Sequence, residues 1–248
     1  MPTAFVTNVL HFSGPAAVSA LLSNGYRVIA HDAAFAQLQV AKAYESENGN
    51  LVAIGDASPE QLVEKVWGNY GPIGVVISND SFGAIHTSVD QANPDDLRNT
   101  LEHLVVFPYL LMKYAIPRIK KQGKANLLFI TSCRMELPLA GGAIPDMARA
   151  AANAFVVSLS LELAPFGIPV NAIAPNYLYS EAYFPAALYK NSPEGKAFIE
   201  QVVPVGRLGD PKELGELIAY FANMQGCFHT GSIVKFAGGW PAAPKRPF

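Results

Sequence analysis

A serine and an arginine lie at the spacing of a serine, tyrosine and basic-residue triad, but a proline holds the tyrosine position. Ser132 and Arg149 take the outer positions, and the residue four places before Arg149 is Pro145. A tyrosine titrates at about pH 10, so a fixed guanidinium is needed to bring its pKa toward neutrality. Proline has neither a titratable group nor a backbone donor. The pattern predicts an enzyme-like site whose proton transfer is in question.

The composition predicts one globular domain over residues 1–248. Of the 248 residues, 50% are hydrophobic and 15% are charged, which is enough to bury a large core. A net charge of -2 without long charged runs predicts no binding to nucleic acid or to an anionic membrane surface. The apolar runs look too short and interrupted to span a bilayer, and the first residues predict no targeting segment. Cys133 and Cys227 predict no disulfide framework, so we expect a cytoplasmic protein.

Short β-branched runs alternate with longer amphipathic stretches, several of which open with proline. The predicted strands are 4–7, 27–30, 74–78, 126–131, 170–173 and 233–236. The predicted helices are 15–24, 59–67, 94–119, 147–163 and 211–224. This alternation predicts an α/β fold, a Rossmann-like doubly wound parallel sheet with helices on both faces. The irregular segment 176–193 is expected to cover a site at the carboxyl ends of the strands.

The loop after the first strand lacks most of the glycines that a dinucleotide site needs. It reads TNVLHFSG over residues 7–14, with Asn8 and Phe12 in place of two glycines and only Gly14 retained. The Phe12 ring either reshapes a pocket for something small or simply packs in an ordinary turn. Asp32 follows the second strand, where it could bind a ribose hydroxyl but more often caps a helix. The five histidines show no metal-ligand spacing, so we expect no metal site.

Motifs along nearly the whole chain resemble those of the short-chain dehydrogenase/reductase superfamily. These motifs are 78–80 (SND), 130–132 (ITS), Arg149, 171–176 (NAIAPN), 207–211 (RLGDP) and 238–239 (GG). Within that superfamily the chain is most similar to the halohydrin dehalogenases, which have exchanged the nicotinamide cofactor for a halide pocket. Thr7, Phe12 and Gly14 fit one of their motifs, and Ser132 with Arg149 fits the ends of another, which places tyrosine at 145.

The resemblance implies a carbon–halide lyase that needs no cofactor. In that family the serine donates a hydrogen bond to the substrate oxygen, the tyrosine removes the hydroxyl proton, and the resulting nucleophile expels halide to close an epoxide. The substrate would be a small vicinal haloalcohol, or an epoxide opened in reverse by azide, cyanide or nitrite. Ser132 and Arg149 match two of the roles, and Asp80 resembles the carboxylate that holds the arginine.

The resemblance also implies a halide cradle and a substrate wall. An anion in an apolar pocket is stabilised by backbone N–H groups and aromatic edges. The cradle would consist of Phe12, Pro175, Asn176, Tyr177 and Leu178. The substrate side would include Phe82, Leu139 and Tyr189. Alternatively, 175–176 only ends a strand and Leu139 belongs to the core.

Three repairs of the missing base are open. Asp146 is adjacent in sequence, although a nearby arginine would make its carboxylate a poor base, and it could instead serve the start of the helix. A tyrosine of the following segment could supply a phenol from the opposite wall; the candidates are Tyr177, Tyr179, Tyr183 and Tyr189. The third possibility is no repair, with slow turnover or none.

Three functions therefore follow from the sequence. The first is a halohydrin dehalogenase impaired by Pro145. The second is a non-catalytic homologue that binds an anion or small molecule, and the third is an NAD(P)-dependent oxidoreductase, disfavoured by the missing glycines, tyrosine and lysine. By resemblance we also expect a homo-oligomer, a tetramer built through helices such as 94–119 and 147–163.

Overall fold

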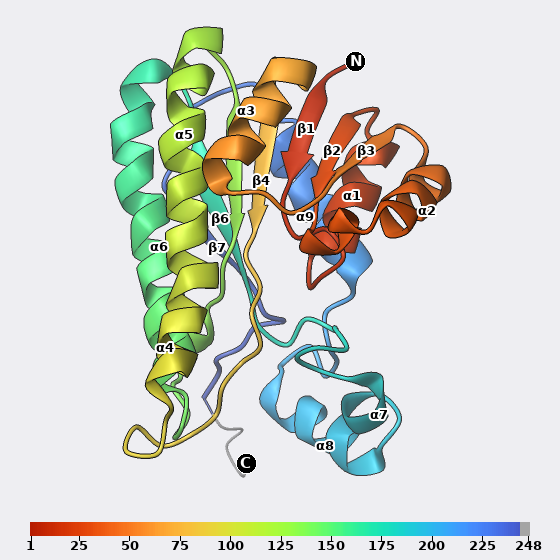
Figure 1. Ribbon diagram of the computed structural model, residues 1–248. Helices are drawn as coiled ribbons and strands as arrows, with labels where there is room; N and C mark the ends of the chain where they lie inside the picture. The colour runs from red at the N-terminus through yellow and green to blue at the C-terminus, as the bar shows by residue number, and fades with distance from the viewer. Residues whose placement is uncertain (244–248) are drawn as a thin grey trace.

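Seven parallel strands form one sheet in the order β3-β2-β1-β4-β5-β6-β7 (Figure 1). The computed structural model describes residues 1–243, and the last residues of the predicted domain, 244–248, lie outside the described residues. The strand order reverses between β1 and β4, and doubly wound sheets bind ligands at the carboxyl ends of strands beside such a reversal. The strands are β1 (Thr3–Val6), β2 (Arg27–His31), β3 (Leu51–Ile54), β4 (Val75–Asn79), β5 (Asn126–Ile130), β6 (Val170–Pro175) and β7 (Ile233–Phe236).

Helices cover both faces of this sheet (Figure 1). α1 and α9 pack together on one face, and α3, α5 and α6 cover the other. The helices are α1 (Gly14–Ser23), α2 (Leu38–Asn48), α3 (Pro59–Tyr70), α4 (Pro94–Leu101), α5 (Phe107–Gln122), α6 (Ala143–Leu163), α7 (Ala186–Tyr189), α8 (Pro193–Val202) and α9 (Pro211–Ala222). Short 3-10 turns are η1 (Ala33–Ala36), η3 (Arg134–Glu136) and η4 (Ala164–Phe166). The Rossmann-like fold predicted from the sequence is confirmed.

The differences from the predicted elements have local causes. The predicted helix 94–119 is divided by a π-helical turn, η2 (Glu102–Val106), just before α5, where Pro108 has no backbone N–H to continue the α-helical hydrogen bonds. β3, α2, α7 and α8 were not predicted. α2 buries only Ala41 and α7 has only four residues, so neither carries a strong apolar pattern. The segment 176–193 contains the short helix α7 and leads into α8.

The helix α6, which carries Pro145 and Arg149, is long and apolar. The segment Ala143–Phe166 is long and apolar enough to cross a membrane by length and composition alone, so the contrary sequence prediction was wrong on this criterion. One such helix is weak evidence for a membrane span, since core helices pass the same test. One face of α6 packs against β6 and buries Val156, Leu159 and Leu163 in the core. Packing on the sheet accounts for the buried face of α6, whereas Met147, Val157 and Leu161 of the same helix are exposed.

A buried asparagine joins the start of β5 to the end of α9. The Asn126 side-chain Nδ2 donates to the carbonyl oxygens of Phe221, Ala222 and Met224 at 3.1, 2.9 and 3.0 Å. Carbonyls in the last turn of a helix have no partner within the helix, so a side-chain donor satisfies them. This contact fixes α9 against the sheet.

Replacing Asn126 with alanine is expected to lower the free energy of unfolding by about 1–3 kcal/mol, because the helix-end carbonyls lose a buried donor. Urea denaturation measures the loss. Asn191→Ala is a matched control at an exposed position and should change stability by less than about 0.5 kcal/mol. Equal stability of the two variants would contradict the role of the Asn126 contact.

Candidate active site

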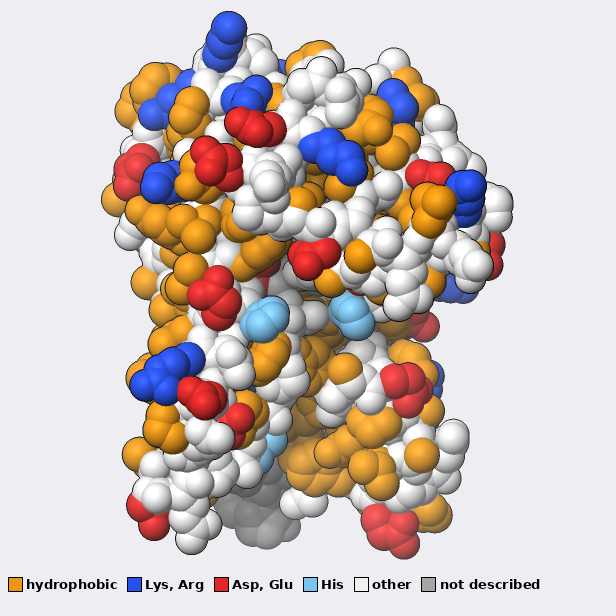
Figure 2. Space-filling model, in the orientation of Figure 1, with side chains coloured by type: hydrophobic (Ala, Val, Ile, Leu, Met, Phe, Trp, Pro, Cys, Tyr) orange, Lys and Arg blue, Asp and Glu red, His pale blue; other side chains and the backbone are white. Residues whose placement is uncertain are grey.

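A cavity of about 490 Å³ lies at the carboxyl ends of the central strands and collects nearly all the predicted site residues. Figure 2 shows a hollow between the α4–α6 side of the molecule and the α7–α8 segment, with hydrophobic side chains on its walls. The predicted residues that line the cavity are Phe12, Phe82, Ser132, Leu139, Pro145, Arg149, Pro175, Asn176, Tyr177, Leu178 and Tyr189. Asp80 does not line it. Segments far apart in the sequence thus meet as the spacing predicted, while the roles of these residues stay predictions.

Several wall residues were missed by reasoning from the sequence. Trp240 follows the paired glycines after β7, and it lies 5.7 Å from the Tyr177 ring between ring centroids. The other missed wall residues include Leu104, Thr131, Arg134, Phe184 and Phe198. The position of Trp240 beyond the carboxyl end of a strand was the one sequence signal that could have found it.

Ser132 stands just beyond β5 with its hydroxyl already engaged. Its Oγ donates to the Pro175 carbonyl at 3.0 Å and accepts the Arg134 N–H at 3.2 Å. Asn153 on α6 donates to the Ser132 carbonyl at 3.0 Å, which holds the backbone in place. For Ser132 to donate to a substrate oxygen, its hydroxyl must turn away from Pro175.

Arg149 is held by Asp80 through the backbone rather than through the carboxylate. The buried guanidinium Nη1 donates to the Asp80 carbonyl oxygen at 2.9 Å. The Asp80 carboxylate is oriented by Ser78, whose hydroxyl donates to Oδ1 at 2.9 Å, and Oδ2 has no hydrogen-bond partner in the described chain. Burial raises the pKa of Asp80 to about 7, against the opposing effects of Ser78 and Arg149. The expected carboxylate clamp on Arg149 is therefore corrected to a carbonyl clamp.

Pro145 lies in the first turn of α6, facing the cavity. α6 begins at Ala143, four residues before the predicted start at Met147. The first N–H groups of a helix have no intrahelical acceptor, so a proline is accommodated there without a lost hydrogen bond. Pro145 therefore occupies the tyrosine position without disturbing the helix that carries Arg149.

Two of the candidate replacement bases are excluded by their contacts. Asp146 pairs with Arg134, whose Nε lies 2.5 Å from its Oδ1, and Asp146 does not line the cavity. Tyr179 donates its phenol hydrogen to Glu181 at 2.5 Å and is also outside the cavity.

The remaining candidate tyrosines, Tyr177, Tyr183 and Tyr189, line the cavity. The Tyr183 phenol donates to the Phe82 carbonyl at 2.6 Å and accepts the Phe82 N–H at 3.2 Å. Burial, followed by the proximity of Tyr189, raises the pKa of Tyr177, so its phenolate is scarce at neutral pH. Neither Tyr177 nor Tyr183 is therefore prepared as a base, and Tyr189 stays a candidate.

The predicted halide cradle has strained backbone but fewer free donors than expected. Phe12 and Tyr177 have φ of 49° and 53°, a left-handed conformation that side chains with a Cβ rarely adopt. The Asn176 N–H donates to the Phe236 carbonyl at 3.1 Å, and the Tyr177 N–H donates to the Asn176 side-chain Oδ1 at 3.0 Å. Of the backbone amides of Asn176, Tyr177 and Leu178, only that of Leu178 remains available to an anion. Strain of this kind is concentrated at functional sites, which favours a binding role for this wall.

The residues do not fit a nicotinamide dinucleotide. Asn8 and Phe12 keep the left-handed backbone of the missing glycines, with φ of 52° and 49°, but the Phe12 side chain projects into the cavity where the ligand would approach. Asp32 is buried, and its carboxylate accepts the N–H groups of Leu10 and Ala34 at 3.0 and 3.1 Å. Asp32 is therefore the cap of η1 and is not placed to bind a ribose.

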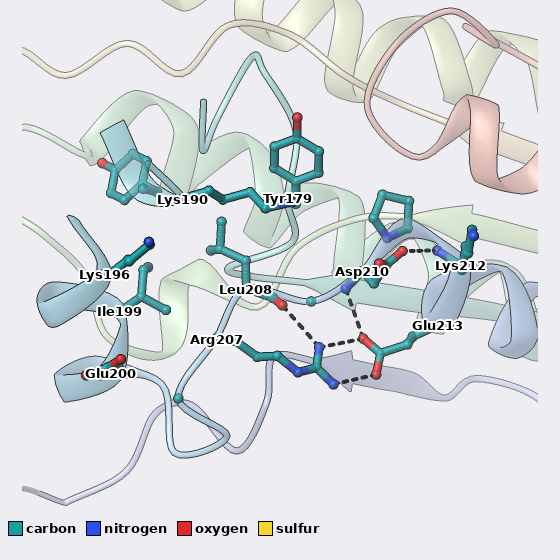
Figure 3. A pocket seen from close by; sticks show the side chains of 14 residues that line it. Tyr179, Lys190, Lys196, Ile199, Glu200, Arg207, Leu208, Asp210, Lys212 and Glu213 are labelled. Carbon is teal, nitrogen blue, oxygen red and sulfur yellow. Dashed lines mark hydrogen bonds and ion pairs between the residues drawn. The ribbon is translucent and has the colours of Figure 1, made fainter. Parts of the chain in front are cut away.

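A second cavity, of about 610 Å³, shares Tyr189 with the first. Figure 3 shows its wall, which includes Tyr179, Arg207 and Glu213. Three of the ionic side chains of this second cavity serve the fold. Arg207 makes two hydrogen bonds to Glu213, at 2.7 and 2.8 Å, and Asp210 caps α9 by accepting the Lys212 N–H at 2.8 Å. We therefore place the candidate active site in the first cavity, where Ser132 and Arg149 meet.

Known proteins share both the sequence pattern and the fold. The sequence model of a family described as enoyl-(acyl carrier protein) reductase matches residues 14–241. A solved halohydrin dehalogenase (HheC) bound to ethyl (2S)-oxiran-2-ylacetate is 32% identical, with a TM-score of 0.94 over 99% of this chain and 100% of that one. A solved dehalogenation enzyme is also 32% identical, with a TM-score of 0.91 over 96% and 98% of the two chains. The uncharacterized oxidoreductase YmfI of Bacillus subtilis (strain 168) is 26% identical over 96% of this chain and 98% of its own.

The chain belongs to the matched family, a branch of the short-chain dehydrogenase/reductase superfamily. Within that superfamily, the two solved structures at 32% identity are both named for dehalogenation. The curated relatives found by sequence are named differently, one as an uncharacterized oxidoreductase and another as a reductase. The similar proteins therefore carry names of two kinds, dehalogenation enzymes and oxidoreductases.

Replacing Asp80 with asparagine is expected to change the pH dependence of stability. The folded protein holds the Asp80 proton more tightly than the unfolded chain, because its pKa is raised from 3.8 to about 7. This group's stabilising contribution is complete below the unfolded pKa and is lost as the pH rises to the folded pKa, by up to about 1.4 kcal/mol per pH unit.

Urea unfolding between about pH 5 and pH 8 tests this prediction. Asp80→Asn should gain stability relative to the unmodified protein as the pH rises to about 7 and hold that gain above it. Stability curves that remain parallel over the whole range would contradict a raised Asp80 pKa.

Proposed function

We propose that the protein is a cofactor-independent, halohydrin dehalogenase-like enzyme that converts small vicinal haloalcohols to epoxides with release of halide. The observation that carries the proposal is the meeting of Ser132 and Arg149 in one apolar cavity with Phe12. The similarity to two dehalogenation enzymes over nearly the full chain supports it. Turnover is slow because position 145 carries no base.

Closure of the epoxide ring needs no protein base if the solvent accepts the proton of the substrate hydroxyl. The substrate hydroxyl loses its proton to hydroxide or water, and the oxygen then bonds to the neighbouring carbon as the carbon–halogen bond breaks and halide leaves with the electron pair. Ser132 and Arg149 stabilise the developing alkoxide by donating hydrogen bonds. The halide departs toward Phe12 and Leu178. In reverse, azide, cyanide or nitrite opens an epoxide in the same cavity.

A non-catalytic homologue that binds an anion is the second candidate. Two features favour it: Pro145 removes the base, and the Ser132 hydroxyl is bonded to the Pro175 carbonyl at 3.0 Å. An NAD(P)-dependent oxidoreductase is disfavoured by the Phe12 side chain and by the buried Asp32. Fluorescence titration with NADPH distinguishes this third function.

A homo-oligomer remains part of the proposal. α6 exposes Met147, Val157 and Leu161 on the side away from the sheet, and Tyr109 is exposed on α5. Apolar surface of this kind favours association between copies. Light scattering at several protein concentrations tests for the tetramer.

Replacing Pro145 with tyrosine is expected to raise halide release from 1,3-dichloro-2-propanol by about 100-fold or more, because a phenol beside Arg149 supplies general-base catalysis. The position is already helical and faces the cavity, so a tyrosine there points at the same space. Halide release without added cofactor is the measurement.

Pro145→Phe is the matched control, since it adds the ring without the hydroxyl and should give no gain. Equal rates for the tyrosine and phenylalanine variants would contradict the role of position 145 as the missing base. Absence of halide release from every variant would favour the binding homologue.

A further inference from the structure

The buried guanidinium of Arg149 has unused donors on the wall of the cavity. Its exposed fraction is only 5%, yet the residue lines the cavity. Among residues 1–243 it makes a single hydrogen bond, from Nη1 to the Asp80 carbonyl. A guanidinium has five N–H donors, and a buried charge without a partner is costly. The remaining donors therefore favour an anionic ligand.

No described side chain that lines the cavity supplies a counter-charge, and the carboxyl that acts on Arg149, that of Asp80, does not line it. No Asp or Glu of the described residues lines the cavity. Burial raises the pKa of Asp80 to about 7, so its carboxyl is partly protonated near neutral pH. Arg134, a second cation of the wall, is paired with Asp146. The other wall residues include one histidine and three tyrosines, His86, Tyr177, Tyr183 and Tyr189, and none of them carries a carboxylate.

Proline at 145 leaves the guanidinium facing the ligand space. A tyrosine there would place its phenol before Arg149, whereas the proline ring is short, apolar and without a donor. Around this cation the wall is apolar and aromatic; it includes Phe12, Phe82, Leu104, Phe184 and Trp240. A cation set in such a wall matches an organic acid with an apolar body.

We propose that Arg149 binds the carboxylate of a small apolar organic acid in this cavity. The planar guanidinium can give two parallel hydrogen bonds to the two oxygens of a carboxylate, a match that a spherical halide does not offer. The proposal rests on the proposed function, because it assigns a ligand class to the same cavity. Replacing tyrosine by proline has then exchanged a base site for a carboxylate site.

Fluorescence of Trp240 tests the proposal directly. The chain has two tryptophans. Trp67, on α3, donates a hydrogen bond to the Gln122 side chain of α5 and does not line the cavity. In a Trp67→Phe background, titration with phenylacetate should quench Trp240 saturably. Phenylacetamide has the same shape without the charge, and we expect it to bind at least about 10-fold more weakly.

Three variants in the Trp67→Phe background test whether Arg149 is the cation that binds the carboxylate. Arg149→Met should weaken phenylacetate binding at least about 10-fold. Pro145→Tyr should also weaken it, because the phenol stands before the guanidinium; this variant retains Arg149 and keeps the test valid if Arg149→Met fails to fold. Arg98→Gln removes an exposed arginine and should bind as the unmodified protein does.

Equal affinity for phenylacetate and phenylacetamide, or binding that survives in a folded Arg149→Met, overturns the carboxylate proposal. If the unmodified protein binds no phenylacetate while Pro145→Tyr releases halide, the carboxylate proposal fails and the dehalogenase function stands. If binding depends on Arg149 and Pro145→Tyr releases no halide, the carboxylate proposal stands and the dehalogenase function fails.

Discussion

The burial of Arg149 is the constraint on which the site depends. The hydrogen bond from Nη1 to the Asp80 carbonyl joins α6 to the loop that follows β4, and it fixes the cation at the edge of an apolar cavity. Asp80 in turn is buried with its carboxyl on Ser78, so this loop cannot move without exposing a polar cluster. Ser132 and the first turn of α6 take their positions around this fixed point.

Much of the fold and the membership of the site were predictable from the sequence. β-Branched runs between proline-led helices predicted six of the seven strands, because buried parallel strands carry a strong apolar signal. The spacing between Ser132 and Arg149 correctly indicated two residues that line the same cavity. The partners of individual polar atoms were not predictable from the sequence. The pairing of Asp146 with Arg134 depends on how the backbone turns between β5 and α6. The hydrogen bond from the Asn176 N–H to the Phe236 carbonyl joins two segments that are far apart in the sequence.

The loop after β1 keeps a backbone conformation that glycines usually adopt, although other residues occupy two of those positions. Asn8 and Phe12 hold left-handed conformations that glycine adopts without strain, and such positions cost about 1–2 kcal/mol for other residues. Asn79 compensates by donating to the carbonyls of Asn8 and His11 at 2.8 and 2.9 Å. The chain thus keeps the geometry of a phosphate-binding turn while filling its space with a phenyl ring.

The contact between Tyr183 and Phe82 has a consequence for the kinetics of ligand exchange. One phenol both donates to and accepts from the backbone of a residue 101 positions away, so the cover over the cavity and the loop after β4 are fastened at a single point. Opening on this side breaks two hydrogen bonds together. A ligand whose entry or exit requires these two segments to separate must therefore break both hydrogen bonds in one step, which slows its exchange.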